Sequence, residues 1–290
     1  MNFNIIGAGR LGKNIALNLI TAQVAQLDSV CNRTIKSARL AINEIGQGSP
    51  VSCIEELPPT DVTWITSNDD AIESVVKQLT QSPNLKPNSF IIHCSGVLNS
   101  QLLLPLKAKG CFIASFHPLK AFKKGNLHSL IFQHVDCVIE GDEAVCAWLE
   151  SNFKNLGANL MTINPNNKAL YHSAAVIASN YLITLAACSE QLLLQAGIPE
   201  QHIRTMITHL MHSNLQNLQT TPTVGNALTG PLMRGDIKTL ELHINAITDP
   251  LVANLYKTAG LATLPMTHLD INTIEQIKTL LKVSRETSGE

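Results

Sequence analysis

The stretch Gly7-Ala8-Gly9-Arg10-Leu11-Gly12 constrains the fold of this chain more than any other. A short apolar run at residues 3–6 precedes it, and residues 13–20 follow it with apolar side chains at helical spacing. The order is therefore strand, glycine turn, helix, which is the context in which the pattern G-x-G-x-x-G binds a dinucleotide. The alternative is a glycine-rich turn that only joins a strand to a helix.

Each glycine of this turn has a physical role in dinucleotide binding. Gly7 permits the tight turn, Gly9 lets the backbone approach a pyrophosphate, and Gly12 lets the helix pack closely on the strand. The free N–H groups and the positive dipole end of the helix then face the phosphates. We therefore predict that Arg10 and Leu11, at the start of this helix, join the three glycines in binding the cofactor.

The end of the second predicted strand, at residues 29–31, indicates which cofactor the chain binds. Asn32-Arg33-Thr34 follow that strand about 20 residues beyond the glycines, where the fingerprint places its ribose-reading residue. An NAD-selective site needs a carboxylate there, whereas Arg33 supplies a guanidinium and its neighbours supply short donors. A 2′-phosphate is favoured by that set, which predicts NADP(H) as the cofactor. The alternative is that Arg33 is a solvated residue at the start of the next helix.

Further short apolar runs alternate with helical patterns along the first half of the chain, at residues 62–66, 90–93, 111–116, 136–140 and 158–163. This alternation predicts an α/β Rossmann domain with a doubly wound, mostly parallel sheet. Such sheets bind ligands at the carboxyl ends of their strands. We therefore predict cofactor contacts from the residues that follow two of these strands, which are Ser67, Asn68, Ser95 and Gly96. For Asn68 the alternative is a helix cap.

Two other residues at predicted strand ends have side chains that could be reactive. His117 precedes Pro118, so its imidazole is rigidly held, and it is either an active-site residue or an anchor for the following loop. Cys94 is interpreted as a small residue at a strand end rather than as a nucleophile.

From Asn164 onward the character of the sequence changes, because no convincing strand follows. We predict a Rossmann domain at residues 1–164 and an all-helical substrate and dimerisation domain at residues 165–290. The longest apolar stretch, at residues 174–194, is interrupted by polar side chains. We therefore interpret it as a buried helix rather than a membrane span. The apolar character of this domain leads to the hypothesis of a homodimer.

The charge balance excludes several classes of partner. The net charge is −1 and the chain has no basic block, so we expect neither nucleic acid nor a membrane as a partner. The seven cysteines form no C-x-x-C pair and indicate reduced thiols in a cytoplasmic protein. The first residues enter a strand at once, which leaves no room for a signal peptide. No metal site is predicted.

Three polar residues lie on one face of the long predicted helix that begins near residue 167. Lys168, His172 and Ser179 fall within about 40° of one another at helical spacing, on an otherwise apolar segment. Such a face needs a wet cleft or polar partners. We predict Lys168 and His172 as catalytic residues and Ser179 as a substrate contact. The alternative is an exposed Lys168 and a histidine satisfied within the core.

Two further residues are candidates at this site. Asn180 lies about 18 Å along the helix from Lys168. It is a catalytic candidate only if the helix bends or the cleft extends that far. Arg234, held between two glycines in Thr229-Gly230-Pro231-Leu232-Met233-Arg234-Gly235-Asp236, could clamp a substrate carboxylate. Asp236 could cap the helix that follows, or pair with Arg234 instead.

Taken together, these clusters resemble a family of oxidoreductases with an NADP-type Rossmann domain and a helical domain long described as of unknown function. The Rossmann domain is similar to those of 6-phosphogluconate dehydrogenase-like proteins, pyrroline-5-carboxylate reductase and the deazaflavin-dependent oxidoreductases. The resemblance rests on the glycine turn, Cys94-Ser95-Gly96, Ser115-Phe116-His117-Pro118-Leu119, Tyr171-His172-Ser173-Ala174-Ala175 with Ala178-Ser179-Asn180, and Thr229-Gly230-Pro231 with Arg234-Gly235-Asp236.

The resemblance implies an NADPH-dependent reductase of a small 2-oxo acid. Some bacterial members of the family are similar to the alternative ketopantoate reductase, so 2-dehydropantoate is the expected substrate. The wider β-hydroxyacid dehydrogenase group uses Lys-x-x-x-Asn, in which the lysine protonates the reduced carbonyl. Lys168 and His172 have that spacing with histidine in place of asparagine, which leaves the proton donor open between them. Alternatives are another carbonyl or imine substrate, or a non-catalytic NADP(H) sensor.

Overall fold

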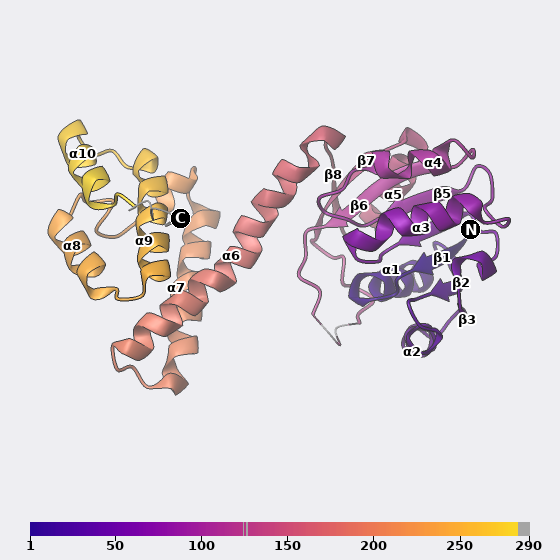
Figure 1. Ribbon diagram of the computed structural model, residues 1–290, viewed down its shortest axis with the longest axis horizontal. Helices are drawn as coiled ribbons and strands as arrows, with labels where there is room; N and C mark the ends of the chain where they lie inside the picture. The colour runs from indigo at the N-terminus through magenta and orange to yellow at the C-terminus, as the bar shows by residue number, and fades with distance from the viewer. Residues whose placement is uncertain (124, 126, 284–290) are drawn as a thin grey trace, which may run out of the picture. The chain divides into compact units, whose positions relative to one another are not determined.

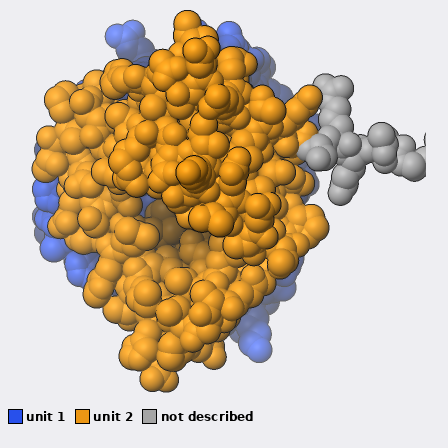
Figure 2. Space-filling model, turned by 90° about the vertical axis from the view of Figure 1, so that its left-hand side faces the viewer, with its two compact units in different colours: residues 1–180 blue, residues 181–290 orange. Residues whose placement is uncertain are grey.

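The computed structural model describes residues 1–123, 125 and 127–283. Its contacts divide the chain into two compact units, Met1–Asn180 and Tyr181–Glu290, which Figure 2 distinguishes by colour. Each unit is described separately below.

The first unit is built on one eight-stranded sheet with the strand order β3-β2-β1-β4-β5-β6-β7-β8. All neighbouring strands are parallel except β6 and β7, which are antiparallel. The predicted doubly wound, mostly parallel sheet is therefore confirmed. The strands are β1 (Asn2–Ile6), β2 (Gln26–Cys31), β3 (Ser49–Val51), β4 (Val62–Ile65), β5 (Phe90–His93), β6 (Phe112–Pro118), β7 (Asp136–Gly141) and β8 (Asn159–Thr162).

Helices cover both faces of this sheet (Figure 1). The helices α1 (Arg10–Thr21), α2 (Ile35–Ile45) and α5 (Glu143–Asn155) pack on one face, in a core that includes the fully buried Trp64 and Phe116. The helices α3 (Asp69–Gln81) and α4 (Leu104–Lys107) form a second core on the other face. Each fully buried large apolar side chain contributes about 1.5–3 kcal/mol relative to its exposure.

The register of the central strands brings their carboxyl ends to one edge. Ile6 pairs with Ile65, Ile65 with His93, and His93 with Ser115. The turns after β1, β4 and β5 are therefore neighbours, and the last residues of β6 extend beside them. This edge is where the predicted cofactor residues gather.

Two local details of the first unit differ from the sequence analysis. His117 and Pro118 belong to β6 itself, because the antiparallel partner β7 extends that strand. The three-residue strand β3 was not expected, because it is too short to show an apolar pattern.

The described part of the second unit is helical throughout, as predicted. It contains the later turns of α6 (Lys168–Gln195) and the helices α7 (Glu200–Thr220), α8 (Ile237–Ala246), α9 (Pro250–Thr263) and α10 (Ile271–Leu280). Its core gathers around Leu240 and Ile277. Asp236 caps α8 as expected, because its carboxylate accepts from the backbone N–H of Thr239 at 3.2 Å. Among the described residues it forms no ion pair with Arg234.

The interpretation of α6 as a buried helix is wrong. By length and composition this helix could cross a membrane, and none of its most apolar 18-residue window is buried. Lys168 is the one buried residue of α6. The apolar pattern predicted burial, but the part of the chain that the structure describes does not cover this helix.

The contacts divide the chain within α6, at 180/181, whereas the sequence suggested a boundary at 164/165. The strands do end before residue 164. The first turns of α6 nevertheless belong to the first unit, because Lys168 and Tyr171 form hydrogen bonds with groups of the sheet.

Candidate functional site

The glycine turn after β1 is held by its own backbone and by neighbouring strands. The N–H groups of Gly7 and Gly9 donate to the carbonyls of Cys31 and Gly7, at 2.8 and 2.6 Å. Gly7 has a φ of +91°, and a Cβ there would lie 2.6 Å from the backbone nitrogen of Ser67. A Cβ on Gly12 would collide with Oγ1 of Thr66, which donates to the carbonyl of Gly7 at 2.8 Å. Both positions therefore require glycine.

This turn leaves the start of α1 open to an anion. The N-cap residue Gly9 has no side chain to accept from the first-turn amides, and the first turn contains no acidic residue. The amides of Arg10, Leu11 and Gly12 and the positive end of the helix dipole are thus available to a pyrophosphate. The hydroxyl oxygen of Ser67, beside the turn, is buried and has no hydrogen-bond partner among the described residues. These features fit a dinucleotide.

The three residues after β2 have separate roles. Oδ1 of Asn32 accepts from the N–H of Ala8 at 2.7 Å, so this side chain holds the glycine turn. Oγ1 of Thr34 caps α2 by accepting from the N–H of Ser37 at 3.2 Å. Arg33 is exposed and forms no ion pair in the described part of the chain. Of the three, Arg33 has the side chain that is free to meet a ribose phosphate.

Lys168 is buried in a polar network at the same edge of the sheet. Its Nζ donates to the carbonyl of Ser95 at 2.8 Å and to Oγ of Ser115. Oε1 of Glu140 lies 3.9 Å from the same Nζ, and both side chains are 1% exposed. The Glu140 carboxylate also accepts from the N–H and hydroxyl of Ser100, at 2.8 and 2.6 Å. The network joins the turn after β5, the strands β6 and β7, and the first residue of α6.

Burial governs the titration of this network. Desolvation lowers the pKa of Lys168 to about 8, although the charge of Glu140 opposes that change. Desolvation and the charge of Lys168 lower the pKa of His93 to about 3, so this imidazole is neutral near pH 7. Burial raises the pKa of the Cys94 thiol far above its usual range, which agrees with its interpretation as an unreactive residue at a strand end.

Two imidazoles converge on Gly96. A Cβ added to Gly96 would lie 2.8 Å from Nε2 of His117 and 2.7 Å from Cε1 of His172, and closer still to Nδ1 of His172. The two rings meet edge to face with centroids 5.5 Å apart. Nδ1 of His117 is 2.8 Å from the phenolic oxygen of Tyr171. Gly96 is therefore the residue that allows both imidazoles to approach the turn after β5.

The protonation of this cluster follows from its burial. Desolvation, with the charges of Lys168 and His172, lowers the pKa of His117 to about 4, so its imidazole is neutral at pH 7. Burial raises the pKa of Tyr171 well above its usual value, so the phenol keeps its proton. Nδ1 of His172 is buried and has no hydrogen-bond partner among the described residues. A buried imidazole nitrogen without a partner is costly unless a ligand meets it.

The structure brings part of the predicted site together. Lys168, His172, His117, Ser95 and Gly96 lie within one cluster of the first unit. The alternative of an exposed Lys168 and a satisfied His172 is wrong on both counts.

Other predicted residues stand apart from this cluster. Ser179 and Asn180 are exposed further along α6, and Arg234 belongs to the second unit. Their roles stay predictions.

Sequence reasoning assigned no role to Glu140, Ser115 or Tyr171, each of which contacts a predicted catalytic side chain. For Glu140 a signal existed, because it is a carboxylate at the end of the apolar run Cys137-Val138-Ile139. For Ser115 and Tyr171 the signal was weak, since only tertiary packing shows which way their hydroxyls point.

Comparisons with known proteins match both parts of the chain. A family described as a Rossmann-like domain matches residues 1–118, and a domain of unknown function, DUF2520, matches residues 135–263. No curated protein matches the chain.

Three solved structures resemble this chain over nearly its whole length. One is BF3122 of Bacteroides fragilis, assigned as an NADP oxidoreductase, with 19% identity, a TM-score of 0.73, and coverage of 91% of this chain and 98% of that one. TM1727 of Thermotoga maritima has 25% identity, a TM-score of 0.70 and coverage of 91% and 97%. Pyrroline carboxylate reductase of Plasmodium falciparum, with NADP bound, has 13% identity, a TM-score of 0.59 and coverage of 97% and 98%. The chain therefore combines a Rossmann-like domain with a DUF2520 domain.

Proposed function

We propose that this chain is an NADPH-dependent reductase of a small carbonyl or imine substrate, which reacts beside Gly96. The observation that carries the proposal is the convergence of His117 and His172 on Gly96, at the same sheet edge as the glycine turn. When bound, NADPH supplies a hydride to the carbon that is reduced and leaves as NADP⁺.

The choice of NADP(H) is supported by two independent features. Arg33 stands where an NAD-selective site has a carboxylate, and it is exposed and forms no ion pair with the residues that the structure describes. The names of two structural relatives include NADP, and one of them holds it. The amides at the start of α1 and the hydroxyl of Ser67 are the groups we expect to contact the rest of the dinucleotide.

The chain places N–H groups at the substrate's oxygen or nitrogen, which gains negative charge as the neighbouring carbon is reduced. If the phenol of Tyr171 donates to Nδ1 of His117, the ring proton of His117 is on Nε2, the nitrogen close to Gly96. His117 then hydrogen-bonds the substrate's oxygen or nitrogen as a neutral donor. We assign the proton transfer to His172, whose Nδ1 has no other partner among the described residues. General acid catalysis of this kind contributes about 10²–10⁴-fold.

Lys168 has a positioning role in this proposal. Its Nζ is fully buried and bound to Ser95 and Ser115, so it fixes the turn that carries Gly96 instead of reaching substrate. Between the two candidate proton donors, this geometry favours His172. Charge at Lys168 also keeps the neighbouring imidazole of His117 neutral.

We also propose two candidates for the substrate. The first candidate is 2-dehydropantoate, on the resemblance to the alternative ketopantoate reductase. The second is a cyclic imine that carries a carboxylate, because a structural relative is a pyrroline carboxylate reductase.

The test is oxidation of NADPH by the purified protein with a panel of 2-oxo acids and cyclic imines, followed at the nicotinamide absorbance. We expect turnover with at least one class and none with NADH at equal concentration. Tight NADPH binding without oxidation across the panel would contradict the proposal in favour of an NADP(H) sensor.

A further inference from the structure

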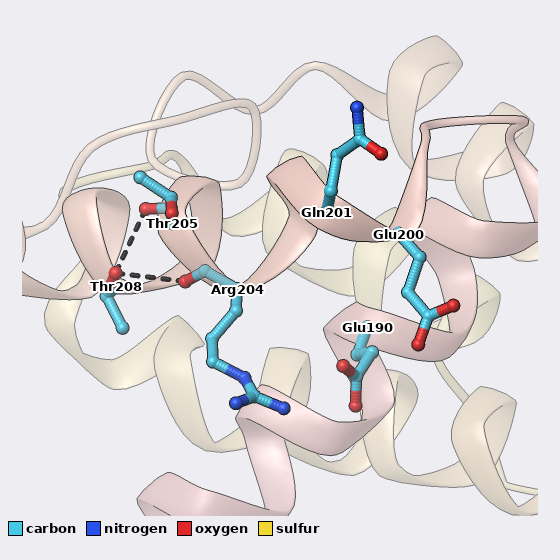
Figure 3. Close-up of a pocket in the computed structure, with 6 residues that line it drawn as sticks. All are labelled: Glu190, Glu200, Gln201, Arg204, Thr205 and Thr208. Atoms are coloured by element: carbon cyan, nitrogen blue, oxygen red, sulfur yellow. Dashed lines mark hydrogen bonds between the residues drawn. The ribbon is translucent and has the colours of Figure 1, made fainter.

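Polar side chains in solvent and in the core place different demands on the fold. In the second unit, one hollow beside the start of α7 is lined by Glu190, Glu200, Gln201, Arg204, Thr205 and Thr208 (Figure 3). All of these side chains are exposed except Glu190, which is half-buried, so water can solvate them. A polar side chain without access to water must find its partners within the fold.

His93 of the first unit is such a side chain. It is the last residue of β5 and is fully buried. Ile91, two residues earlier on the same face of the strand, belongs to the apolar core formed with α3 and α4, and so does Ile65, which pairs with His93. An apolar side chain here would avoid the cost of removing an imidazole from water. What the imidazole adds is hydrogen bonding by its ring nitrogens.

The imidazole of His93 faces both ends of the turn that carries Gly96. Its Nδ1 accepts from the N–H of Ser95 at 3.2 Å, so the proton of the neutral ring is on Nε2. Burial lowers the pKa of His93 and the backbone of Asn99 opposes that change, which indicates that the Asn99 carbonyl lies close to the ring. Among the described residues, Nε2 still has no partner with hydrogen-bonding geometry. The ring therefore supports the turn at residues 95–99 from the core side.

The position of Gly96 within this turn depends on Ser95. The Ser95 carbonyl accepts from Nζ of Lys168 at 2.8 Å, and its Oγ accepts from the N–H groups of the two residues after Gly96, at 3.3 and 3.0 Å. Gly96 itself forms no hydrogen bond within the described ranges. Its place is therefore set by Ser95, which Lys168 holds through the carbonyl and His93 holds through the N–H.

We propose that His93 is a positioning residue of the proposed reductase, whose hydrogen bond with Ser95 sets the distance between Gly96 and the imidazoles of His117 and His172. The clearance there is small, because a Cβ on Gly96 would lie 2.8 Å from Nε2 of His117. A misplacement of about 1 Å at a reacting group lowers a rate by about 10²-fold. The catalytic consequence rests on the proposed function, whereas the link between His93 and the two imidazoles does not.

The kinetic test compares two substitutions of His93. His93→Leu removes the acceptor of the Ser95 N–H, whereas His93→Asn keeps one. We expect His93→Leu to lower kcat at least about tenfold, with the KM and the Kd for NADPH within about twofold of the parent, and His93→Asn to restore most of kcat. Asn4→Leu is the control that keeps the parent kcat, because it also replaces a buried polar side chain of the sheet by leucine, in β1. Equal losses in His93→Leu and His93→Asn, or an unchanged kcat in His93→Leu, would overturn the proposal.

Nuclear magnetic resonance of the histidine rings gives a readout that needs no substrate. We expect the ring signals of His117 and His172 to shift in His93→Leu, because Gly96 moves, and to stay in place in His93→Asn and Asn4→Leu. Unshifted signals in a folded His93→Leu variant would overturn the proposal. If the signals shift but the parent reduces no substrate of the panel, the positioning of Gly96 by His93 stands and the result contradicts the reductase activity instead.

The parent protein provides a test that does not depend on any variant. With ¹⁵N-labelled histidine, we expect the His93 signals of a neutral ring whose proton is on Nε2. A proton on Nδ1 would overturn the proposal, because that nitrogen could not then accept from Ser95. Circular dichroism verifies that each variant is folded, and the tautomer of the parent decides the matter where His93→Leu does not fold.

Discussion

The phenolic oxygen of Tyr171 lies 2.8 Å from Nδ1 of His117, across 54 residues of sequence. The bond joins the first turn of α6 to the last residues of β6. If the phenol is the donor, the ring proton of His117 is on Nε2, the nitrogen close to Gly96. A single hydroxyl thus links the fold of the first unit to the proposed chemistry.

Removing this hydroxyl tests that link. We expect Tyr171→Phe to lower kcat about tenfold or more, because Nδ1 of His117 loses its partner and the ring populates both tautomers. We expect the Kd for NADPH to stay unchanged, since the hydrogen bond of the phenol is to His117 and not to the glycine turn. Stopped-flow binding and steady-state kinetics separate the two effects. Equal kcat values for variant and parent would contradict the assigned tautomer.

Gly96→Ala tests the convergence of the imidazoles. The added methyl group occupies the space of His117 Nε2 and His172 Nδ1, so both rings must move. We expect kcat to fall about 10²-fold or more, in the range of lost general acid catalysis. Gly225→Ala is the matched control, because its Cβ would meet no atom closer than 3.5 Å. Comparable loss of activity in both variants would mean that the effect at Gly96 is not specific.

The buried pair of Lys168 and Glu140 makes a prediction about stability. Removing one partner of a buried ion pair costs about 3–5 kcal/mol, because the other charge stays buried. We expect Glu140→Gln and Lys168→Ala each to lower the free energy of unfolding by about this amount in urea titrations. We also expect Lys168→Ala to lower kcat far more than it lowers the affinity for NADPH. The double variant Lys168→Met/Glu140→Leu should be more stable than either single change. Additive losses in the double variant would show that the two charges do not interact.

Cofactor choice should depend on Arg33 and not on Asn32. We expect Arg33→Asp to weaken NADPH binding at least tenfold and to improve NADH binding, because a carboxylate repels the 2′-phosphate and accepts from a ribose hydroxyl. Asn32→Ala removes the acceptor of the Ala8 N–H and should weaken both cofactors to the same extent. Fluorescence titration of the reduced cofactors gives both ratios. An unchanged NADPH to NADH ratio in Arg33→Asp would mean that the selectivity lies elsewhere.

The lowered pKa of His93 predicts that the folded protein loses stability in acid. Its pKa is about 3 in the folded chain against a usual value of 6.5, so the unfolded chain binds more protons between these pH values. The free energy of unfolding therefore falls as the pH drops from 6.5 toward 3. His93→Asn keeps an acceptor for the N–H of Ser95 and removes the titration. We expect its unfolding free energy to fall less than that of the parent over this range, and parallel curves would contradict the prediction.

The parts of the fold that were predictable from sequence are those with local patterns. The glycine turn and the apolar strands can be recognised from patterns of a few residues. The helices of the second half can be recognised in the same way. The exposure of α6 was not predictable, because hydropathy reports what a helix can bury and not whether the chain covers it. The antiparallel pairing of β6 with β7 also lacks a local signal.

Some residues of the candidate site were also predictable from local patterns, and the contacts between them were not. Gly7 and Gly12 were predictable from the glycine fingerprint and Gly96 from its place after a strand, whereas the approach of two imidazoles to Gly96 was not. His172 and Lys168 were found from helical spacing, but spacing does not reveal that the lysine is buried against Glu140. The hydrogen bond from the N–H of Ala8 to Oδ1 of Asn32, which holds the glycine turn, also had no signal in the sequence. Pairings between distant residues need the tertiary structure.

The buried ion pair between Glu140 of β7 and Lys168, the first residue of α6, limits where the chain can be cut to make a stable fragment. A fragment that stops at residue 164 keeps Glu140 in the core of the sheet and discards the cation that faces it. Such a fragment leaves an uncompensated carboxylate and exposes the surface on which the first turn of α6 rests. A fragment that keeps this ion pair therefore includes the first turns of α6, and the compact unit to which they belong ends at Asn180, within that helix.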